Sequence, residues 1–325
     1  DRLYCMQKTR LLVTGGCGVI GSNFINYIFE KGTYAIVNMD AMYYCANETN
    51  VDESIRQHPD YMLVKGNVCS EDLVRHVLES NQIDEVVHFA AQSHVQNSFD
   101  DSLQFTKDNI LGTHVLLECC RKYGKIRKFV HVSTDEVYGE SMNSVDEKHK
   151  TEHSILCPTN PYAATKAGAE LIAQSYNHSY GMPIIITRGN NVYGPNQYPE
   201  KLIPRFIKQL HNCEKVTIQG NGTAVRAFLH AKDTARAFEC ILEKGVVGEI
   251  YNIGCDEGME YSVMDVAKLL IRKICMNDDY DNWITYIEDR PFNDQRYYIS
   301  NQKLRDLGWS VEIGFEKGID DLLRN

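Results

Sequence analysis

The sequence predicts an α/β fold, in which a doubly wound parallel sheet is followed by a smaller, mixed α/β domain at the C-terminus. Apolar runs typical of buried strands alternate with helical patterns through the first half of the 325-residue chain. This alternation favours right-handed βαβ units and therefore a parallel sheet. After about residue 188 turn residues become dense, as in 189–199 and 220–223, and the strand-like runs lie further apart. We expect this second part of the chain to hold a substrate.

The expected elements follow from apolar periodicity and from the residues that end each run. Short buried strands are expected at 11–14, 35–39, 61–64, 85–89, 128–133 and 183–187. Helices are expected at 24–29, 71–78, 104–123, 161–180 and 231–244. Asn160 can cap the helix that starts at Pro161, and Gly181 lies just past its end. The helix at 231–244 can pack back on the first domain.

The composition excludes several classes of protein. A net charge of −10 argues against nonspecific binding to DNA or to an anionic membrane, which requires a basic surface. No apolar run approaches the roughly 20 residues of a membrane span, and the first ten residues do not resemble a secretory signal. The 11 cysteines are scattered without a Cys-x-x-Cys pair, so we expect reduced thiols and a cytoplasmic protein. His149 and His153 have the spacing of zinc ligands but lack a third one, so no metal site is expected.

A glycine-rich turn, residues 14–22, joins a predicted strand to a predicted helix. Gly15, Gly18 and Gly21 allow a tight turn, close approach of the backbone to a pyrophosphate, and close packing of the helix on the strand. The helix N-terminus offers free N–H groups and a positive dipole to the same pyrophosphate. Asp40 ends the second strand, 19 residues after Gly21, where its carboxylate can accept hydrogen bonds from the adenosine ribose. It would repel the 2′-phosphate of NADP, so the pattern predicts a Rossmann-type domain that binds NAD.

A second group of residues suggests acid–base chemistry beside this cofactor. Tyr162 and Lys166 lie four residues apart on one predicted helix, and an ammonium beside a phenol favours the phenolate. Thr134 ends a strand that can run beside the cofactor, and its hydroxyl can bond the same substrate oxygen. The neighbouring carboxylates Asp135 and Glu136 cannot both ionise easily, so they can supply one general acid and one general base. Each pattern alone is also typical of a solvated surface, but together they predict redox chemistry coupled to elimination.

Six stretches carry a family resemblance, namely 14–22, 90–95, 133–139, 162–166, 199–204 and 289–291. They resemble those of the nucleotide-diphosphate-glucose 4,6-dehydratases, which are extended short-chain dehydrogenases/reductases, and the match runs from about residue 9 to residue 322. The Thr-Asp-Glu triplet at 134–136 is its most specific part, because related sugar epimerases keep the Tyr and Lys but lack the acid–base pair. Gln92, residues 189–197 and residues 290–297 look more like the UDP-glucose 4,6-dehydratase domain of plant-type rhamnose synthases than like the bacterial dTDP-glucose enzymes.

The resemblance implies that oxidation, dehydration and reduction of a hexose occur in one site. Hydride leaves sugar C4 for a tightly bound NAD while Tyr162 takes the O4 proton, aided by Thr134 and Lys166. Glu136 then removes the C5 proton, Asp135 protonates the departing C6 hydroxyl, and the cofactor returns hydride to C6. NAD is regenerated at each turnover. The implied product is UDP-4-keto-6-deoxyglucose, an intermediate in UDP-rhamnose or related deoxysugar synthesis.

The same resemblance implies binding sites and domain boundaries. The implied cofactor-binding residues are Gly15, Gly18, Ile20, Gly21, Asp40, Asn67, Val68, Ala90, Ala91, Tyr162 and Lys166. The implied substrate-binding residues are Gln92, Ser93, Thr134, Asn191, Lys201, Arg226, Asn252, Asn293 and Arg296. Asn67 stands where many relatives have an Asp that faces the adenine. We expect residues 1–186, with about 225–244, to form the NAD-binding domain, and residues 187–224 and 245–325 to form the nucleotide-sugar-binding domain.

Three alternatives stay open: a dTDP-glucose 4,6-dehydratase, a UDP-hexose 4-epimerase with the same Tyr and Lys, and a catalytically silent NAD-binding regulator. Asp135 and Glu136 count against the epimerase, and the intact catalytic set counts against the regulator. The resemblance also implies a homodimer with a four-helix interface, for which the helices 104–123 and 161–180 are candidates. The plant proteins continue into a second catalytic domain, so later steps toward rhamnose would need a separate epimerase/reductase.

Overall fold

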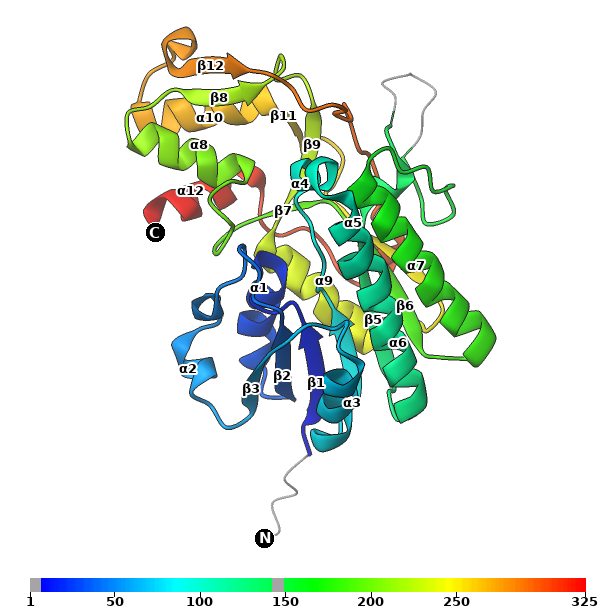
Figure 1. Cartoon of the computed structure of the whole chain (residues 1–325). Coiled ribbons are helices and arrows are strands. Elements are labelled where there is room, and N and C mark those ends of the chain that lie inside the picture. The colour runs from blue at the N-terminus through cyan, green and yellow to red at the C-terminus, as the bar shows by residue number, and fades with distance from the viewer. Residues whose placement is uncertain (1–6, 142–148) are drawn as a thin grey trace.

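The computed structural model describes residues 7–141 and 149–325. Its larger lobe contains one parallel seven-stranded sheet with the strand order β10-β6-β5-β4-β1-β2-β3. The order reverses at β1, with β2 and β3 on one side and β4 and the later strands on the other. This confirms the predicted doubly wound sheet, which occupies the lower half of Figure 1. Its strands are β1 (Thr9–Thr14), β2 (Tyr34–Asp40), β3 (Tyr61–Lys65), β4 (Glu85–His88), β5 (Lys128–Thr134), β6 (Ile184–Gly189) and β10 (Ile250–Ile253).

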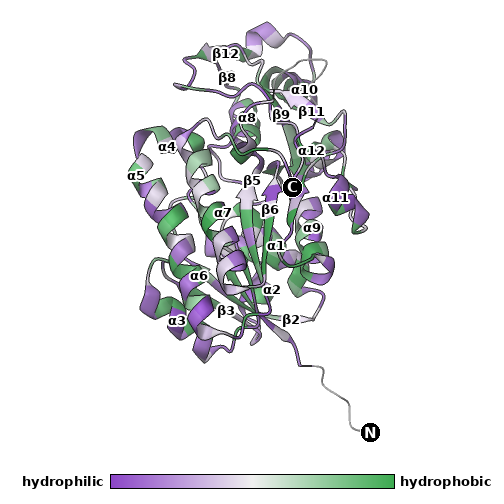
Figure 2. Cartoon of the chain, turned by 90° about the vertical axis from the view of Figure 1, so that its right-hand side faces the viewer, coloured by the Kyte–Doolittle hydropathy of each residue, from purple (hydrophilic) through white to green (hydrophobic). Residues whose placement is uncertain are grey.

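Helices cover both faces of this sheet and enclose two separate apolar cores. Successive residues of β1 point to opposite faces, so Leu11 and Val13 pack in one core and Leu12 packs in the other. Figure 2 shows the hydrophobic colouring concentrated where the helices meet the strands. The first core is covered by α1 (Val19–Phe29) and α9 (Ala231–Lys244), and the second by α3 (Glu71–Ser80), α6 (Gly112–Tyr123) and α7 (Pro161–Tyr180). The helix predicted at 231–244 thus packs beside α1 on the large sheet.

The local signals that bound α7 act as predicted. Oδ1 of Asn160 accepts a 2.9 Å hydrogen bond from the Ala163 N–H, and Pro161 opens the first turn. Gly181 follows the helix with a φ of 65°, in the left-handed region that favours glycine. The ends of α7 are therefore fixed by sequence, and this sets which of its side chains face the sheet.

The helix predicted at 104–123 is not one continuous α-helix. α5 (Ser102–Phe105) leads into a π-helical stretch, η2 (Thr106–Leu111), and α6 begins only at Gly112. The wider turn carries the side chain of Asn109, which bonds the backbone N–H and C=O of Gln92 and the hydroxyl of Thr165. Apolar periodicity did not reveal this stretch, because the polar partners that hold it come from distant parts of the chain.

A smaller lobe lies above the C-terminal ends of the large sheet (Figure 1). It contains a three-stranded sheet in the order β11-β9-β7 and the two-stranded sheet β12-β8, with parallel and antiparallel pairs. Its core includes Tyr193, Phe206, Phe228 and Phe315. The elements are β7 (Asn191–Tyr193), α8 (Leu202–His211), β8 (Val216–Gln219), β9 (Val225–His230), β11 (Glu260–Ser262), α10 (Val263–Cys275), β12 (Ile284–Ile287) and α12 (Phe315–Arg324).

The chain passes between the two lobes more often than the predicted domain boundaries imply. β10 lies within 245–325, the range expected in the smaller domain, yet it pairs with β6 in the large sheet, and α11 (Gln302–Asp306) packs against it. Conversely, residues 225–230 form β9 of the smaller lobe. β10 has only four residues, too few for a clear strand pattern. We propose that β10 and α11 be grouped with the NAD-binding domain and β9 with the sugar-binding domain.

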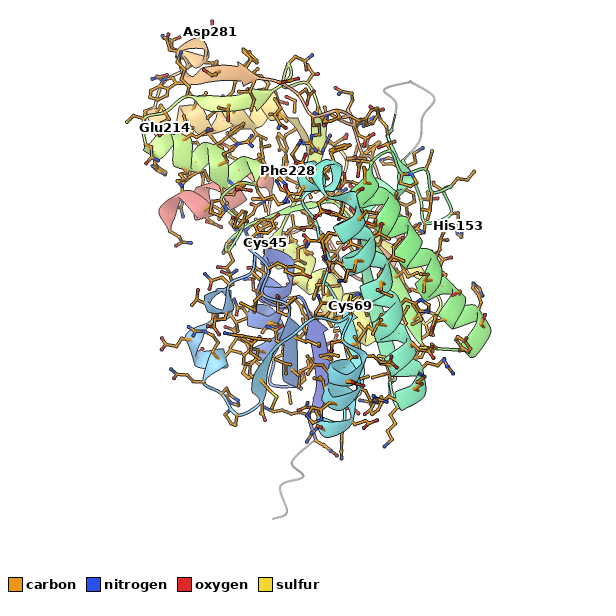
Figure 3. All side chains as sticks on the ribbon, viewed as in Figure 1. Cys45, Cys69, His153, Glu214, Phe228 and Asp281 are labelled. Atoms are coloured by element: carbon orange, nitrogen blue, oxygen red, sulfur yellow. The ribbon has the colours of Figure 1, made fainter. Side chains whose placement is uncertain are left out.

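Other features of the described residues concern the expectations about membrane spans, disulfides and metal ligands. Among them, no helix is both long enough and apolar enough to cross a membrane, and their cysteines are free thiols. The described residues contain no cluster of potential metal ligands; the His149 ring lies against the Tyr298 ring, and His153 sits on the loop before α7 (Figure 3). The remaining short elements are η1 (Glu48–Asn50), α2 (Glu53–Arg56), α4 (Val95–Asp100), η3 (Asp135–Tyr138) and η4 (Tyr280–Trp283).

Candidate active site

A cavity of about 710 Å³ lies between the two lobes, above the C-terminal ends of β1, β4 and β5. The strand order reverses there, and in open α/β sheets this reversal opens a crevice that binds ligands. The cavity wall contains most of the predicted site residues. They are Gly15, Gly18, Ile20, Gly21, Asp40, Asn67, Val68, Ala90, Ala91, Ser93, Thr134, Glu136, Tyr162, Lys166, Asn191, Lys201, Arg226 and Asn293.

One end of the cavity is formed by the glycine-rich turn between β1 and α1. Gly15 has a φ of 72°, and a Cβ there would lie 2.7 Å from the Ala90 nitrogen. A Cβ on Gly21 would collide with the carbonyl oxygen of Gly15, so α1 packs close to the turn. The carboxylate of Asp40 accepts hydrogen bonds from the backbone N–H of Cys17 at 2.9 Å and of Met42 at 2.8 Å. Because the turn has glycines at these positions, backbone atoms border this end of the cavity. The Asp40 carboxylate lies buried beside them, at the end of β2.

Next to this turn, Asn67 and Val68 follow β3 and line the cavity. The Asn67 side chain accepts a hydrogen bond from the Cys69 N–H at 2.9 Å and donates one to the Tyr43 hydroxyl, also at 2.9 Å. The Tyr43 hydroxyl in turn donates to Asp108 of the π-helical stretch. Asn67 therefore fixes this wall of the cavity through its own side-chain contacts.

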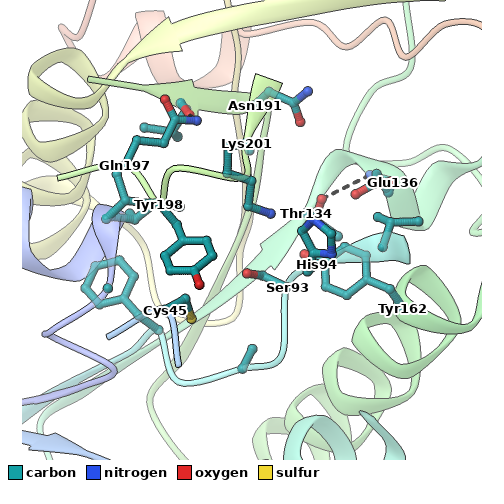
Figure 4. Close-up of a pocket in the computed structure, with 18 of the residues that line it drawn as sticks. Cys45, Ser93, His94, Thr134, Glu136, Tyr162, Asn191, Gln197, Tyr198 and Lys201 are labelled. Atoms are coloured by element: carbon teal, nitrogen blue, oxygen red, sulfur yellow. Dashed lines mark hydrogen bonds between the residues drawn. The ribbon is translucent and has the colours of Figure 1, made fainter. Parts of the chain in front are cut away.

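The Thr-Asp-Glu triplet lies where β5 passes into η3. Oγ1 of Thr134 accepts a 3.3 Å hydrogen bond from the Glu136 N–H, and this contact turns the chain so that Thr134 and Glu136 both face the cavity (Figure 4). Asp135 lies behind them and is 3% exposed. Its Oδ2 accepts a 2.9 Å hydrogen bond from the Asn190 amide. The triplet thus presents a hydroxyl and a carboxyl to the cavity with a second carboxyl buried beside them.

Burial changes the proton affinities of both carboxyls. It raises the pKa of Asp135 from 3.8 to about 7, and the charge of Glu136 adds to the rise. Burial likewise raises the pKa of Glu136, while the Arg226 guanidinium and a hydrogen bond from Tyr297 oppose the increase. A carboxyl that is half protonated near neutral pH can act as a general acid, and its ionised neighbour can act as a base. The pair therefore has the electrostatics that elimination of water requires.

Tyr162 and Lys166 lie in the first turns of α7 and line the cavity together with Thr134 and Glu136. Tyr162 lies beside Thr134 and His94 in Figure 4, and both Tyr162 and Lys166 are almost fully buried. Burial raises the pKa of the Tyr162 phenol, and a hydrogen bond with Thr134 opposes the rise. Burial lowers the pKa of Lys166 to about 8, and its Nζ donates a 2.7 Å hydrogen bond to the Val132 carbonyl. The phenol, the hydroxyl and the ammonium are thus gathered around one space.

The smaller lobe contributes a cluster of cations to the opposite wall. Lys201 and Arg226, both predicted, are joined there by Arg205 and Arg290, which sequence reasoning did not place in the site. The Nε atoms of Arg205 and Arg290 are buried without a hydrogen-bond partner among the described residues. Arg290 lies in the Asp-Arg-Pro stretch that carried the family resemblance, and that stretch was the available signal for it. An acidic protein therefore concentrates four cations where an anionic group could bind.

Three predicted substrate-binding residues do not line this cavity. The Gln92 amide donates to Asp108 at 3.0 Å. Asn252 is fully buried, and its Oδ1 accepts a 2.6 Å hydrogen bond from the Tyr138 hydroxyl. Arg296 makes a paired contact with both carboxylate oxygens of Glu260, at 2.8 and 2.7 Å. Their positions give no support to the predicted substrate contacts, because each side chain is engaged by a protein partner: Gln92 by Asp108 of the cavity wall, and Asn252 and Arg296 by residues outside that wall.

The family described as GDP-mannose 4,6 dehydratase matches residues 12–322. The dTDP-D-glucose 4,6-dehydratase of Dictyostelium discoideum is 43% identical over 96% of this chain and 80% of its own length. The chain belongs to the nucleotide-sugar 4,6-dehydratase family. This confirms the family resemblance that the sequence motifs predicted.

Two further relatives place the chain within this dehydratase family. A trifunctional UDP-glucose 4,6-dehydratase/UDP-4-keto-6-deoxy-D-glucose 3,5-epimerase/UDP-4-keto-L-rhamnose-reductase of Arabidopsis thaliana is 49% identical over 96% of this chain. The chain spans about half of that relative's length, 46%. The dTDP-glucose 4,6-dehydratase DesIV of Streptomyces venezuelae, crystallised with NAD bound, has a TM-score of 0.90 and 36% identity, covering 97% of this chain and 96% of DesIV. The dehydratase fold therefore extends over both lobes of the chain.

Proposed function

We propose that this chain is an NAD-dependent lyase that converts UDP-glucose to UDP-4-keto-6-deoxyglucose. The observation that carries the proposal is the pairing of buried Asp135 with Glu136 beside Thr134 and Tyr162. Oxidation of a sugar hydroxyl needs only the groups of Tyr162, Thr134 and Lys166, and a 4-epimerase would use the same set. Loss of water needs an additional acid and base, and this site has both. The same pair makes a non-catalytic NAD-binding regulator a poor account of the site.

The dinucleotide end of the cavity fits NAD. Gly15 and Gly21 keep the turn tight, because a Cβ at either position would collide with the backbone of Ala90 or of Gly15, and α1 begins directly after this turn. Asp40 lies at the end of β2, where a carboxylate can accept ribose hydrogen bonds and repel a 2′-phosphate. NAD held by this turn and Asp40 would supply hydride chemistry, with the hydride taken from C4 restored at C6, so no external redox partner would be needed. DesIV, crystallised with NAD, supports this cofactor assignment.

Proton transfer at O4 falls to Tyr162. Its phenolate takes the O4 proton and becomes the neutral phenol, while the Thr134 hydroxyl bonds the same oxygen and the ammonium of Lys166, one turn along the helix, favours the phenolate. Burial lowers the pKa of Lys166 to about 8, so the lysine keeps its charge through most of the physiological pH range. These groups hold O4 in place and take its proton. The resulting 4-ketone makes the neighbouring C5 proton acidic.

Elimination then falls to the two carboxyls. Glu136 faces the cavity and takes the C5 proton. To Asp135, which is buried directly behind it, we assign the proton that the departing C6 oxygen takes. The C6–O bond breaks as the C5–C6 double bond forms, so the products of this step are water and an enone. The pKa of Asp135, raised to about 7, keeps a substantial fraction of this acid protonated at neutral pH.

The diphosphate of the substrate would be held by the cations of the smaller lobe. Lys201, Arg205, Arg226 and Arg290 line the cavity together, and two of the arginines have unpartnered buried nitrogens. Guanidinium groups suit phosphate oxygens because they donate two hydrogen bonds in one plane. Asn293 accepts a 3.3 Å hydrogen bond from Arg226 and lies at the same wall, where it could contact the nucleotide base.

Product mass tests this function. The purified protein should be incubated with UDP-glucose and, separately, with dTDP-glucose, without added NAD. Loss of one water from UDP-glucose supports the proposal. Turnover confined to dTDP-glucose would instead establish the second candidate, which the Dictyostelium relative favours with 43% identity over 80% of its length. A new chromatographic peak with the mass of the substrate would identify an epimerase, because an epimer keeps its C6 hydroxyl and differs from unreacted substrate only in retention.

We also propose that the protein is a cytoplasmic homodimer and that its keto sugar is consumed by epimerase and reductase activities. Leu103 of α5, Leu111 of η2 and Leu171 of α7 are 81%, 46% and 55% exposed, and these three helical segments pack together. An apolar patch on adjacent helices suits a symmetric helical interface. The mass in solution by light scattering should be twice that of the chain, and Leu171→Glu should halve it.

A further inference from the structure

The hydroxyl of Tyr297 lies between two carboxyls. It is 3.0 Å from Oε1 of Glu136 and also contacts Oδ2 of Asp294. Tyr297 and Asp294 are 4% and 3% exposed, so both belong to the protein interior. The Arg226 guanidinium lies 4.8 Å from the centre of the Tyr297 ring and holds it from the cavity side. Glu136, the carboxyl that faces the sugar, is therefore joined to a second buried carboxyl through one phenol.

Asp294 also joins this group to the helix that carries Tyr162. Oδ2 of Asp294 accepts a 2.5 Å hydrogen bond from the hydroxyl of Thr159, which directly precedes the N-cap residue Asn160 of α7. The other oxygen of Asp294, Oδ1, is buried without a hydrogen-bond partner among the described residues. A buried carboxyl that served only to hold the fold would be expected to have both oxygens satisfied. Through its contact with Tyr297, Asp294 lies close enough to act on Glu136, whose pKa it raises.

The number of available protons limits what this arrangement can do. A phenol has one O–H and can donate to one carboxylate at a time. When both carboxyls are ionised they compete for that hydrogen, and their charges repel across the phenol. Both effects favour a proton on Glu136. The ionisable groups that act on Glu136 from the surrounding elements are Asp135, Tyr162, Lys201, Arg226, Arg290, Asp294 and Tyr297.

We propose that Asp294 is a positioning residue that acts through Tyr297 to make Glu136 a stronger base for the C5 proton. Tyr297 orients the Glu136 carboxylate, and the charge of Asp294 raises its affinity for a proton. In the elimination step the C5–H bond breaks and its proton moves to Oε of Glu136. Asp294 stays unchanged and contacts neither the sugar nor the cofactor. This inference rests on the proposed dehydratase function.

Two substitutions test it, because they should move the same titration in opposite directions. Asp294→Asn removes the competing charge and leaves the Tyr297 hydrogen fully available to Glu136, so the pKa of Glu136 should fall. Tyr297→Phe removes a hydrogen bond to the carboxylate and leaves the charge of Asp294 in place, so the pKa should rise. The midpoint of the acid limb in the pH profile of kcat/KM should therefore shift to lower pH in Asp294→Asn and to higher pH in Tyr297→Phe. Each shift should be about one pH unit.

The controls separate this effect from a loss of structure. Tyr286→Phe removes a phenol that is 59% exposed on β12 and should leave the acid limb where the parent has it. Reduced nicotinamide should still form in both test variants at the parental rate, because oxidation at C4 does not use Glu136. If both acid limbs move in the same direction, or neither moves, the inference is wrong even though the parent is active. If the parent itself releases no water from either nucleotide-glucose, the proposed function fails first.

Discussion

The side-chain amide of Asn190 donates a 2.9 Å hydrogen bond to Oδ2 of Asp135, and its own carbonyl oxygen accepts one from the Cys255 N–H at 2.8 Å. Asn190 follows β6, so it ties the acid at the end of β5 to the neighbouring strand of the large sheet. This contact fixes the direction of the Asp135 carboxyl. A buried acid held in this way should affect both the pH dependence of stability and the dehydration step.

The first prediction concerns stability. The folded-state pKa of Asp135, about 7, lies above its unfolded value near 3.8, so the folded protein binds this proton more tightly than the unfolded chain does. The stabilising contribution of the protonated carboxyl is present below about pH 4 and is lost as the pH rises through about 7. Asp135→Asn should therefore stabilise the protein more at pH 8 than at pH 5. The difference between the two pH values should be about 1–4 kcal/mol in unfolding free energy, and thermal melts at both would measure it. An equal change at both pH values would contradict the raised pKa.

The second prediction concerns the use of Asp135 as an acid. If its protonated form expels the C6 hydroxyl, the dehydration rate should fall as the pH rises through about 7. Asp135→Asn should lose this alkaline limb and most of its dehydration rate, by a factor of about 10² to 10⁴. Steady-state assays between pH 5 and pH 9 measure both effects. An alkaline limb that keeps its midpoint near pH 7 after the substitution would assign the acid to another group, since Lys166, with a pKa of about 8, accounts only for a limb at higher pH.

The third prediction separates oxidation from elimination. Tyr162→Phe removes the group that takes the O4 proton, so the appearance of reduced nicotinamide should slow by about 10² or more. Tyr180→Phe, at the exposed end of the same helix, should oxidise the sugar like the parent. Stopped-flow absorbance of the nicotinamide follows this step directly. Rapid oxidation by the Tyr162→Phe variant would mean that another base serves O4.

The fourth prediction concerns the glycine turn. Gly15 and Gly32 have nearly the same φ, 72° and 71°, but a Cβ at Gly15 would lie 2.7 Å from Ala90, whereas nothing lies within 4 Å of one at Gly32. Both Gly→Ala variants should be strained by about 1–3 kcal/mol. Gly15→Ala alone should also lose cofactor, measured as nicotinamide dinucleotide released on denaturation. Equal cofactor content in the two variants would place the dinucleotide elsewhere.

Much of the site could be predicted because its key residues sit at positions fixed by local sequence. Thr134 ends a strand, Tyr162 and Lys166 share one helix face, and the glycine spacing defines the turn. The periods of strands and helices and the cap at Asn160 are local properties, so the large sheet and α7 follow from them.

The remainder depends on contacts between distant parts of the chain. Asn190 and Tyr297 reach the acid–base pair only through tertiary packing, across 55 and 161 residues. Asn252 was predicted to face the substrate, but the direction of a side chain on a short strand changes with a register shift of one residue. The π-helical stretch at 106–111 depends on the bonds that Asn109 makes to distant partners. None of these relationships leaves a periodic trace in the sequence.

The most direct test of the central claim is a single-turnover experiment with Glu136→Gln. Glutamine keeps the shape of the side chain but cannot take the C5 proton, so the account predicts oxidation at C4 without loss of water. The absorbance of reduced nicotinamide should appear and persist, and mass spectrometry should find no dehydrated sugar. Release of a dehydrated product at the parental rate would contradict the assignment of Glu136 as the base.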